Sequence, residues 1–453
     1  LAAGSPCINA GDNAAAAGAT DLDGSPRIVF GTVDLGAYEF LYQHVAPGGS
    51  DGADGISWAT AKQTIQAAVD VTTNGCIVLV TNGVYATGGR TVNDSVLTNR
   101  VAIDRPIIVQ SVNGPEVTII RGMAPTHNTR CAYVGSNAVL TGFTLTNGLA
   151  SGSDDRYGGG AFIAGGSMEH CVISGNYAWE GAGAYIAGAG TLSNCSVIGN
   201  SAGDTGGGGG VFSSNAGQVV NCLIADNYAE WAPGVYGRGG GMELVNCTIS
   251  GNSSLGGPAV AAPTSTLWNC IVYSNNVDAG YQEIEGDPVV LHCCSPGLSG
   301  NGNVTNDPQF VAAAAGNYRL QATSPCLDAG DDDGVSWAED LDGNPRIAFG
   351  AVDMGAYEAQ LTGAGTWFGA ITNGQTGDLD CVAGDGVPNL LKYATGGSPR
   401  ISDDNVILGW PLDGARPALT FHRNPSATDV RLVVEGTDRM TNGAAWRGVA
   451  TNV

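Results

Sequence analysis

Short runs of alternating apolar and polar residues recur along the middle of the chain, and clusters of glycine separate them. Examples are AFIA at 161–164 and AYIA at 184–187, each followed by a second run such as CVI or CSVI. Because successive side chains of a strand point to opposite faces, this alternation predicts short strands with one buried face. Glycine clusters such as 206–210 argue against a helical repeat, since glycine destabilises helices. The pattern predicts an all-β fold.

The short runs belong to a repeating unit in which a cysteine is followed, at the fifth position after it, by an asparagine. The cysteines recur at nearly equal intervals along the chain: Cys171, Cys195, Cys222, Cys247 and Cys270. The asparagines are Asn176, Asn200, Asn227, Asn252 and Asn275. A period of this length is typical of solenoids. With strand-rich repeats it predicts a parallel β-helix over residues 75–318, with about ten coils roughly 4.8 Å apart and a rod about 50 Å long.

Equivalent positions of successive coils stack on one another, so the repeat predicts two columns of side chains. A cysteine column would be buried, because free cysteine behaves as a small apolar residue. Disulfides between coils are the alternative. An asparagine column at a turn would be stabilised by hydrogen bonds between stacked amides, and asparagine also accepts a left-handed backbone. We expect both columns to be structural.

A longer repeat divides the chain into modules. The segment 5–39 recurs at 324–358 without a gap, so that Cys7 corresponds to Cys326 and Glu39 to Glu358. Residues 1–39 are therefore interpreted as the tail of a preceding module, and residues 40–358 as one complete module. The parent protein is expected to carry several modules in tandem.

Within the complete module, a capping helix is predicted at 57–73, with Ser57 as its N-cap, ahead of the coils. Such a cover is expected because open sheet edges promote aggregation. Residues 320–358 form an acidic module end. The composition changes after residue 360, and residues 361–453 are predicted to form a small C-terminal β-rich domain.

The net charge of −24 narrows the range of partners. Only two of the 18 basic residues are lysines, Lys62 and Lys392. Such a surface repels nucleic acids and anionic membranes but attracts divalent cations. No segment approaches the ~20 apolar residues of a membrane-spanning helix. The 71 glycines accompany 43% hydrophobic residues, which fits tight turns around an apolar core rather than disorder.

Several segments resemble known families. SWATAKQTIQAAVD (57–70) and RPIIVQSVNGPEVTIIRG (105–122) resemble the opening of bacterial right-handed β-helix proteins of the pectate-lyase-like superfamily. The repeated segments 5–39 and 324–358 resemble the module ends of choice-of-anchor Q surface proteins, and the Cys/Asn coils are similar to polymorphic outer-membrane protein repeats. The resemblance implies a right-handed parallel β-helix that is extracellular or held at the cell surface.

Calcium is the cofactor that the acidic residues suggest, because clustered carboxylates in a turn suit hard cations. Three aspartates of the first module end recur in the second: Asp21, Asp23, Asp34, and Asp340, Asp342, Asp353. The alternative is an acidic turn that caps strands and pairs with Arg27 or Arg346. GDGVPNLLKYATGGSP (384–399) resembles a calcium-loop-like segment, and its candidate ligands, with two preceding aspartates, are Asp378, Asp380, Asp385 and Asn389.

Polysaccharide cleavage on this scaffold would need calcium-binding acids with a basic residue, or paired carboxylates. The candidates lie in loops of neighbouring coils: Arg156, Arg238, Asp154, Asp155, Glu180 and Glu230. Their arrangement repeats no known catalytic signature, and a solvated loop surface is the alternative. Aromatic residues of these loops could stack on sugars or on a protein partner, or pack on one another: Tyr177, Trp179, Tyr228 and Trp231.

We interpret the chain as a non-enzymatic, secreted or cell-surface structural or adhesive protein. Tandem β-helix modules would stack into a rod and assemble head-to-tail into an extracellular fibre. The expected partners are neighbouring copies or modules, with surface polysaccharide as a further candidate. The alternative is a calcium-dependent polysaccharide lyase or a glycan-binding module.

Overall fold

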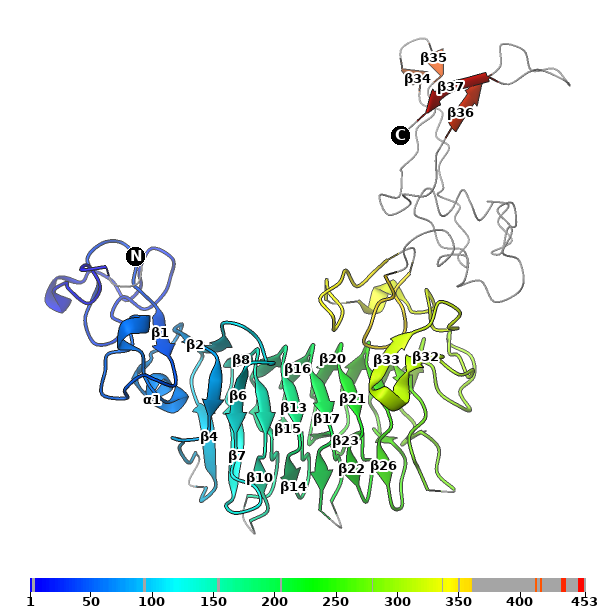
Figure 1. The fold of residues 1–453 in the computed structure, drawn as a ribbon, viewed down its shortest axis with the longest axis horizontal. Coiled ribbons are helices and arrows are strands. Elements are labelled where there is room, and N and C mark those ends of the chain that lie inside the picture. Colours follow the sequence, from blue (N-terminus) through cyan, green and yellow to red (C-terminus); the bar gives the residue numbers. More distant parts are fainter. Residues whose placement is uncertain are drawn as a thin grey trace, which may run out of the picture. The chain divides into compact units, whose positions relative to one another are not determined.

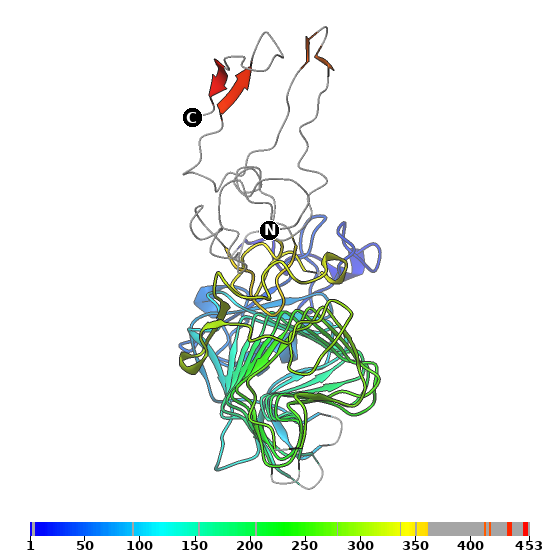
Figure 2. The same cartoon turned by 90° about the vertical axis from the view of Figure 1, so that its right-hand side faces the viewer.

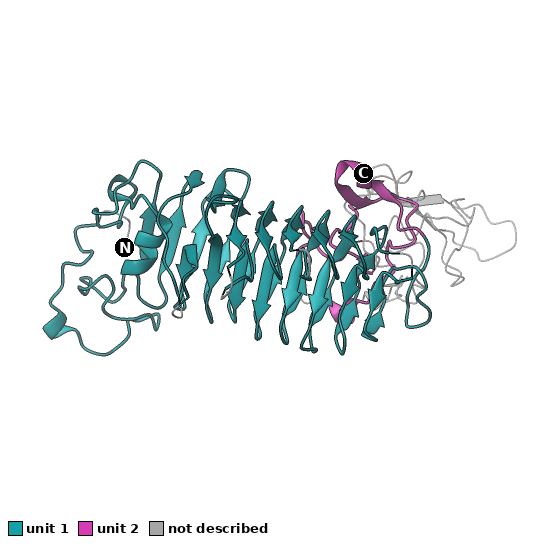
Figure 3. Cartoon of the chain, turned by 90° about the horizontal axis from the view of Figure 1, so that it is seen from below, with its two compact units in different colours: residues 1–306 teal, residues 307–453 magenta. Residues whose placement is uncertain are grey.

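The computed structural model describes residues 1, 5–92, 95–152, 155–203, 206–278, 280–335, 337–348 and 351–360. Further along the chain it describes only the backbone of four short strands: β34 (Leu412–Asp413), β35 (Arg416–Pro417), β36 (Val433–Gly436) and β37 (Arg447–Thr451). The chain divides into two compact units, residues 1–306 and 307–453, coloured separately in Figure 3.

Unit 1 is a parallel β-helix whose strands stack into three sheets (Figure 1). Sheet 1 comprises β1 (Tyr42–Val45), β2 (Ile77–Val80), β5 (Ile108–Ser111), β8 (Val139–Thr141), β12 (Ser167–Glu169), β16 (Thr191–Ser193), β20 (Gln218–Val220), β24 (Glu243–Val245), β28 (Thr266–Trp268) and β31 (Val289–Leu291). Sheet 3 comprises β3 (Gly83–Tyr85), β6 (Thr118–Arg121), β9 (Thr144–Thr146), β13 (Val172–Ser174), β17 (Ser196–Ile198), β21 (Leu223–Ala225), β25 (Thr248–Ser250) and β29 (Ile271–Val272).

Sheet 2 contains two rows of strands. The longer row comprises β4 (Thr98–Ile103), β7 (Thr129–Val134), β11 (Ala161–Ala164), β15 (Ala184–Ala187), β19 (Val211–Ser213), β23 (Val235–Gly237), β27 (Val260–Ala261) and β30 (Ile284–Glu285). The shorter row comprises β10 (Leu149–Ala150), β14 (Tyr177–Ala178), β18 (Ser201–Ala202), β22 (Tyr228–Ala229) and β26 (Ser253–Ser254). Figure 2 looks along the coils and shows the sheets surrounding one interior.

The register of the coils places residues of the same kind above one another in the core. Leu140, Met168, Leu192, Val219, Leu244 and Leu267 are successive Cα partners in sheet 1, and all are fully buried. One continuous apolar core therefore runs through the coils. This arrangement confirms the all-β parallel solenoid that the sequence predicted.

The solenoid has about eight turns, fewer than we expected. The early coils are longer than the Cys/Asn repeat suggested. Ile77, Ile108 and Val139 are successive partners, and the intervals between them exceed those between the cysteines of the later coils. At the other end a partial coil follows β31, because Cys294 forms a parallel bridge with Ile271 of β29. Cys294 also bridges Val304, and the N–H of Ser295 donates to the carbonyl of Val304 (3.0 Å), so the residues around Val304 cover this last segment.

The helix ahead of the coils is shorter than predicted. It is α1 (Ile65–Val71), and its N-cap is Thr64, whose hydroxyl accepts the N–H of Ala67 (3.2 Å). The prediction that Ser57 caps it is wrong. Ser57 precedes a one-turn 3-10 helix, η2 (Trp58–Thr60), and makes no side-chain cap bond there. Residues 61–63 cannot be helical, because the N–H and carbonyl of Lys62 bond to the chain around β1.

The remaining described elements are short. Unit 1 also contains the 3-10 helix η1 (Asn13–Ala15), and unit 2 contains η3 (Ala313–Ala315), η4 (Asp332–Gly334) and the antiparallel pair β32 (Phe310–Ala312) and β33 (Asn317–Leu320). Within the described part of the chain, none of the helices has the length and apolar character needed to cross a membrane.

Candidate functional site

The asparagine column is a continuous hydrogen-bonded ladder at the turn that follows sheet 3. Each asparagine donates its backbone N–H and one Nδ2 hydrogen to the Oδ1 of the next, at 2.9–3.1 Å, through Asn176, Asn200, Asn227, Asn252 and Asn275. The other Nδ2 hydrogen goes to a backbone carbonyl of an earlier coil, such as Val197 for Asn227 (2.9 Å). All donors point the same way along the ladder.

These asparagines do not use the left-handed backbone that we associated with them. That conformation occurs at the residue preceding each cysteine: His170, Asn194, Asn221, Asn246 and Asn269, with φ between 49° and 55°. Asparagine is favoured there for its tolerance of positive φ. The NC dipeptide carried this signal in the sequence, and our interpretation of the repeat missed it.

The ladder ends on a carboxylate that the sequence analysis did not identify. Glu283 accepts the backbone N–H of Asn275 (3.1 Å) and its Nδ2 (2.8 Å) through its two oxygens. Glu283 is 8% exposed. Burial raises the pKa of Glu283, and the hydrogen bonds from Asn275 partly oppose that shift.

Replacing Glu283 with glutamine is expected to change the pH dependence of stability. The folded-state pKa lies above the unfolded value of about 4.5. The stability that this group contributes is therefore fully present below that value and is lost as the pH rises through the folded-state pKa. The melting temperature of Glu283→Gln, relative to that of the wild type, should rise from about pH 4 to about pH 7. The exposed variant Glu243→Gln is the control, and a flat difference for Glu283→Gln would contradict this assignment.

The cysteine column is buried, and its thiols are not in disulfide bonds. The backbone N–H of Cys171 donates to Sγ of Cys195 (3.3 Å), and that of Cys270 to Sγ of Cys293 (3.2 Å). The thiols in turn donate to backbone carbonyls, for example Cys222 to Val220 (3.2 Å). Cys293 extends the column by one coil beyond the cysteines that the sequence repeat identified.

The acidic module ends use their carboxylates within the turn. Asp21 accepts three backbone N–H groups, and Asp34 accepts those of Asn9 (2.7 Å) and Phe40 (2.6 Å). Glu39 accepts the N–H of Asp34 and forms an ion pair with Arg27 (2.9 Å). Asp23 is exposed.

The second module end repeats this pattern. Asp340 accepts three backbone N–H groups, and Asp353 accepts those of Asp328 and Ala359. Asp342 forms a two-bond ion pair with Arg319 (2.5 and 2.6 Å), a partner that we had not considered.

These contacts decide how well the predicted calcium ligands fit an ion. Among the described residues, no group of three or more His, Cys, Asp or Glu side chains is arranged to hold a metal. Most of the predicted ligands in both module ends accept hydrogen bonds within the turn, so a calcium ion would have to displace them. Calcium binding there stays a prediction. The tail candidates Asp378, Asp380, Asp385 and Asn389 lie outside the described residues.

The outward face of sheet 2 carries a stack of five aromatic rings, which we call the aromatic stack: Tyr133, Phe162, Tyr185, Phe212 and Tyr236. Neighbouring centroids are 5.0–5.8 Å apart. The first four rings are nearly parallel, so each covers the face of the next. A sugar stacks on an open ring face, and these faces are largely used within the stack.

Beside the aromatic stack lie three of the candidate catalytic residues. Nη1 of Arg238 is 3.5 Å from Oε1 of Glu180, and the guanidinium also lies over Phe212 at 5.6 Å. The Arg238 side chain is 59% exposed, whereas that of Glu180 is 10% exposed. Oε2 of Glu180 is buried without a hydrogen-bond partner. Arg156 lies over the ring of Trp179 at 5.0 Å in the adjoining loop.

The charges of this cluster favour binding over proton transfer. Attraction to Glu180 raises the pKa of Arg238, which makes its guanidinium a poor general base. Burial raises the pKa of Tyr185, and Glu180 acts in the same direction.

The remaining candidates do not complete a catalytic pair. Asp155 forms an ion pair with Arg130 and accepts a hydrogen bond from the hydroxyl of Ser95 (2.9 Å), so it stabilises the loop. Glu230 is half-buried, and Asp154 lies outside the described residues. The contacts of Asp155 are thus with Arg130 and Ser95 and not with Glu180.

The four loop aromatics are dispersed over two coils. Tyr177 on β14 and Tyr228 on β22 lie in the same row with Ser201 of β18 between them. Trp179 stacks under Arg156, and Trp231 packs edge-on against Tyr281 at 5.4 Å. Packing within the loops thus uses both tryptophans, as the alternative interpretation expected.

Comparison with known proteins agrees with the fold. Residues 159–318 match the family model described as "Right handed beta helix region". Among solved structures, the chain is similar to pectate lyase Pel9A, at 16% identity over 70% of this chain and 96% of that one, with a TM-score of 0.41. It is also similar to pectin methylesterase PemA from Erwinia chrysanthemi (13%; 59% and 81%; TM-score 0.34) and to ORF18 of Geobacillus virus E2 (16%; 56% and 52%; TM-score 0.36). Among curated proteins, none matches.

Proposed function

We propose that this chain, whose coils form a right-handed β-helix of the pectate-lyase-like kind, is a non-enzymatic structural or adhesive protein that acts outside the cell. The observation that carries the proposal is the way the first module end joins the coils. Val29 is 1% exposed and belongs to the same apolar core that continues through the coils to Cys293. A module end built into the start of a coil stack suits a protein assembled from modules in series.

The distribution of the charged side chains supports the same role. Buried charged side chains hold turns and loops, as Arg130 does by pairing with Asp155 and Glu39 by pairing with Arg27. The ladders of asparagine and cysteine add stacked hydrogen bonds inside the rod. These features stabilise an elongated scaffold and require no reaction centre.

Negative-stain electron microscopy of the protein, with calcium and then with chelator, tests this proposal. We expect elongated rods that associate into fibres at high concentration. If the chelator shortened the fibres, calcium would be placed at the contacts between neighbouring molecules. Isolated rods under all conditions, together with release of unsaturated sugars from a polysaccharide panel, would overturn it in favour of a lyase.

A glycan-binding role is the second candidate, and the exposed guanidinium of Arg238, paired with the largely buried Glu180, favours it. Arg238 could bind a carboxylate or hydroxyl of a sugar while Glu180 holds the guanidinium in place. Because the cluster provides one carboxylate and a poor base, it supports binding rather than cleavage.

If a glycan binds there, Arg238→Ala should weaken binding by about tenfold, since a hydrogen bond to a charged group contributes about 1.5 kcal/mol or more. Titration calorimetry against acidic and neutral oligosaccharides measures the effect, and Arg121→Ala, on an exposed arginine outside the cluster, is the matched control. Equal affinity in the wild type and Arg238→Ala would exclude this site.

A further inference from the structure

The two module ends have the same fold, although they lie in different units. Asp21 and Asp340 each bind three backbone N–H groups at equivalent positions. Asp34 and Asp353 each bind the N–H of the residue that follows the recurring glutamate of the motif, Phe40 and Ala359. What one module end contacts is therefore a guide to what the other can contact.

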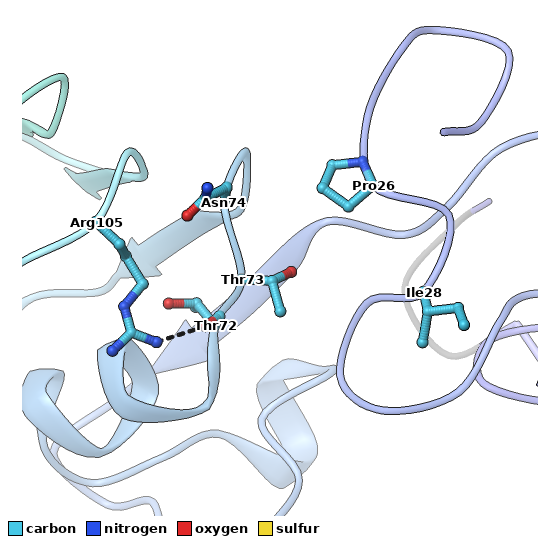
Figure 4. A pocket seen from close by; sticks show the side chains of 6 residues that line it. All are labelled: Pro26, Ile28, Thr72, Thr73, Asn74 and Arg105. Atoms are coloured by element: carbon cyan, nitrogen blue, oxygen red, sulfur yellow. Dashed lines mark hydrogen bonds between the residues drawn. The ribbon is translucent and has the colours of Figure 1, made fainter. Parts of the chain in front are cut away.

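The first module end packs against the start of the coils through its Pro-Arg-Ile-Val segment. A Cβ placed on Gly75 would lie 3.5 Å from Cδ of Pro26, so the two segments lie close together. Val29 enters the core, and Phe30 packs against it. Figure 4 shows Pro26 and Ile28 facing Thr72, Thr73, Asn74 and Arg105 across a cavity of about 460 Å³. We call these last four residues the coil-entry surface.

The coil-entry surface is a built feature of the fold. Nη1 of Arg105 donates to the carbonyl of Thr72 (2.8 Å), which fixes the end of α1. The hydroxyl of Thr72 donates to the carbonyl of Val69 (2.7 Å), and Thr72 is 3% exposed. The surface therefore presents a fixed shape to whatever packs on it.

The second module end presents the equivalent segment without such cover within its own unit. Pro345 is exposed where Pro26 is half-buried, whereas Ile347 and its counterpart Ile28 are similarly exposed, at 44% and 40%. Ala348, equivalent to the fully buried Val29, is half-buried. Arg346 is 1% exposed and holds the turn through the carbonyls of Asp353 and Gly355 (2.8 and 2.7 Å). Pro345, Ile347 and Ala348 thus form an apolar corner that is rigid and open.

We propose that the corner formed by Pro345, Ile347 and Ala348 docks on the coil-entry surface of a second copy of this chain. The inference rests on the proposed function and names the joint that such a rod would use. In an isolated chain, residues 26–30 of the same molecule already lie beside the coil-entry surface with Val29 in the core, and their tether gives them the advantage. Head-to-tail docking requires that this tail leave and be replaced by the module end of another copy. Such a contact joins two different surfaces and forms open chains of molecules.

Loosening the tail tests the proposal on the whole chain. Val29→Asp places a charge where the tail enters the core, so it should release the tail and open the coil-entry surface. Light scattering after size exclusion should show concentration-dependent oligomers of Val29→Asp, while the wild type stays smaller. Adding Ala348→Asp should return the protein to monomers. Adding Val311→Asp instead, at an exposed position of β32 in the same unit, should leave the oligomers unchanged.

Cross-linking supplies a second measurement in case Val29→Asp perturbs the coils, which circular dichroism would reveal. A chain carrying Thr73→Cys and another carrying Ile347→Cys, mixed and treated with a short bis-maleimide, should give a covalent heterodimer after mild heating that releases the tail. Ile28→Cys with Thr73→Cys in one chain should give an intrachain product. Folded Val29→Asp that remains monomeric, or the absence of the heterodimer while the intrachain product forms, would overturn the proposal. Fibres that persist in Ala348→Asp would leave the structural role intact and exclude this joint.

Discussion

Asn227→Ala is expected to destabilise the β-helix by about 4 kcal/mol or more, one of the two largest effects that the structure predicts, because each unsatisfied buried group costs about 1–3 kcal/mol. Oδ1 of Asn227 accepts the backbone N–H and Nδ2 of Asn200 (2.9 and 3.0 Å). Its Nδ2 donates to the carbonyl of Val197 (2.9 Å) and to Oδ1 of Asn252 (2.9 Å). Alanine removes all four bonds at a fully buried position and leaves the backbone N–H and one Nδ2 hydrogen of Asn200 without this acceptor, while Oδ1 of Asn252 still accepts the backbone N–H of residue 227.

Urea unfolding followed by circular dichroism measures this loss as a lower midpoint. Asn276→Ala is the matched control, because Asn276 directly follows the ladder residue Asn275 but is exposed. The control should change the free energy of unfolding by no more than about 0.5 kcal/mol. If both variants unfolded at the same urea concentration, the ladder would not be a principal source of stability.

The ladder also shows what the sequence can and cannot predict. The spacing of Cys and Asn was enough to place both columns, because a coil of nearly constant length forces equivalent residues to stack. Glu283 was missed, since it takes the place of a sixth asparagine from a different position in the coil, well after Asn275. Because Glu283 does not recur at the spacing of the repeat, the repeat could not identify it.

Departures from regular coils account for the other differences between the predicted and the observed fold. The number of turns was overestimated because the first coils, as the pairing of Ile77, Ile108 and Val139 shows, are longer than the later ones and lack the Cys/Asn motif. The start of α1 was misplaced because Lys62 is held by backbone bonds to β1, a contact between segments that local sequence does not specify.

The candidate site was predictable only in part. The sequence placed Glu180, Arg156 and Arg238 in loops of neighbouring coils, and the structure brings Glu180 and Arg238 together. The aromatic stack was not foreseen, although its rings occupy the same position of successive strands. Alternation within each strand was visible, but the stack depends on the register between coils that differ in length.

Arg130→Met should destabilise the fold by about 3–5 kcal/mol, as does the loss of one member of a buried ion pair, although no motif in the sequence marks this arginine. Arg130 is 1% exposed, and burial lowers its pKa while Asp155 opposes that shift. Its Nη1 donates to Oδ1 of Asn99 (2.8 Å), its Nε to the carbonyl of Gly158 (2.9 Å), and its guanidinium lies over Phe162 at 5.0 Å. Methionine fills much of the volume but leaves these acceptors unsatisfied.

A double-mutant cycle separates the ion pair from the other contacts. Adding Asp155→Asn to Arg130→Met removes the carboxylate that has lost its partner. The double variant should therefore lose less unfolding free energy than the two single variants together, by about 1–3 kcal/mol. Urea midpoints of the four proteins give this value, with Arg121→Met as the exposed control. Additive effects would show that Asp155 and Arg130 do not stabilise each other.

The same variant tests whether the candidate site depends on the scaffold beneath it. Arg130 binds the carbonyls of Tyr157 and Gly158, and the N–H of Gly158 donates to the carbonyl of Glu180 (3.1 Å). Arg130→Met should therefore let the loop that positions Glu180 and Trp179 move, although Arg130 itself is buried. If oligosaccharides bind at Glu180 and Arg238, their affinity should fall in Arg130→Met under conditions where the variant is still folded. Unchanged affinity in a folded Arg130→Met would show that binding uses another surface of the rod.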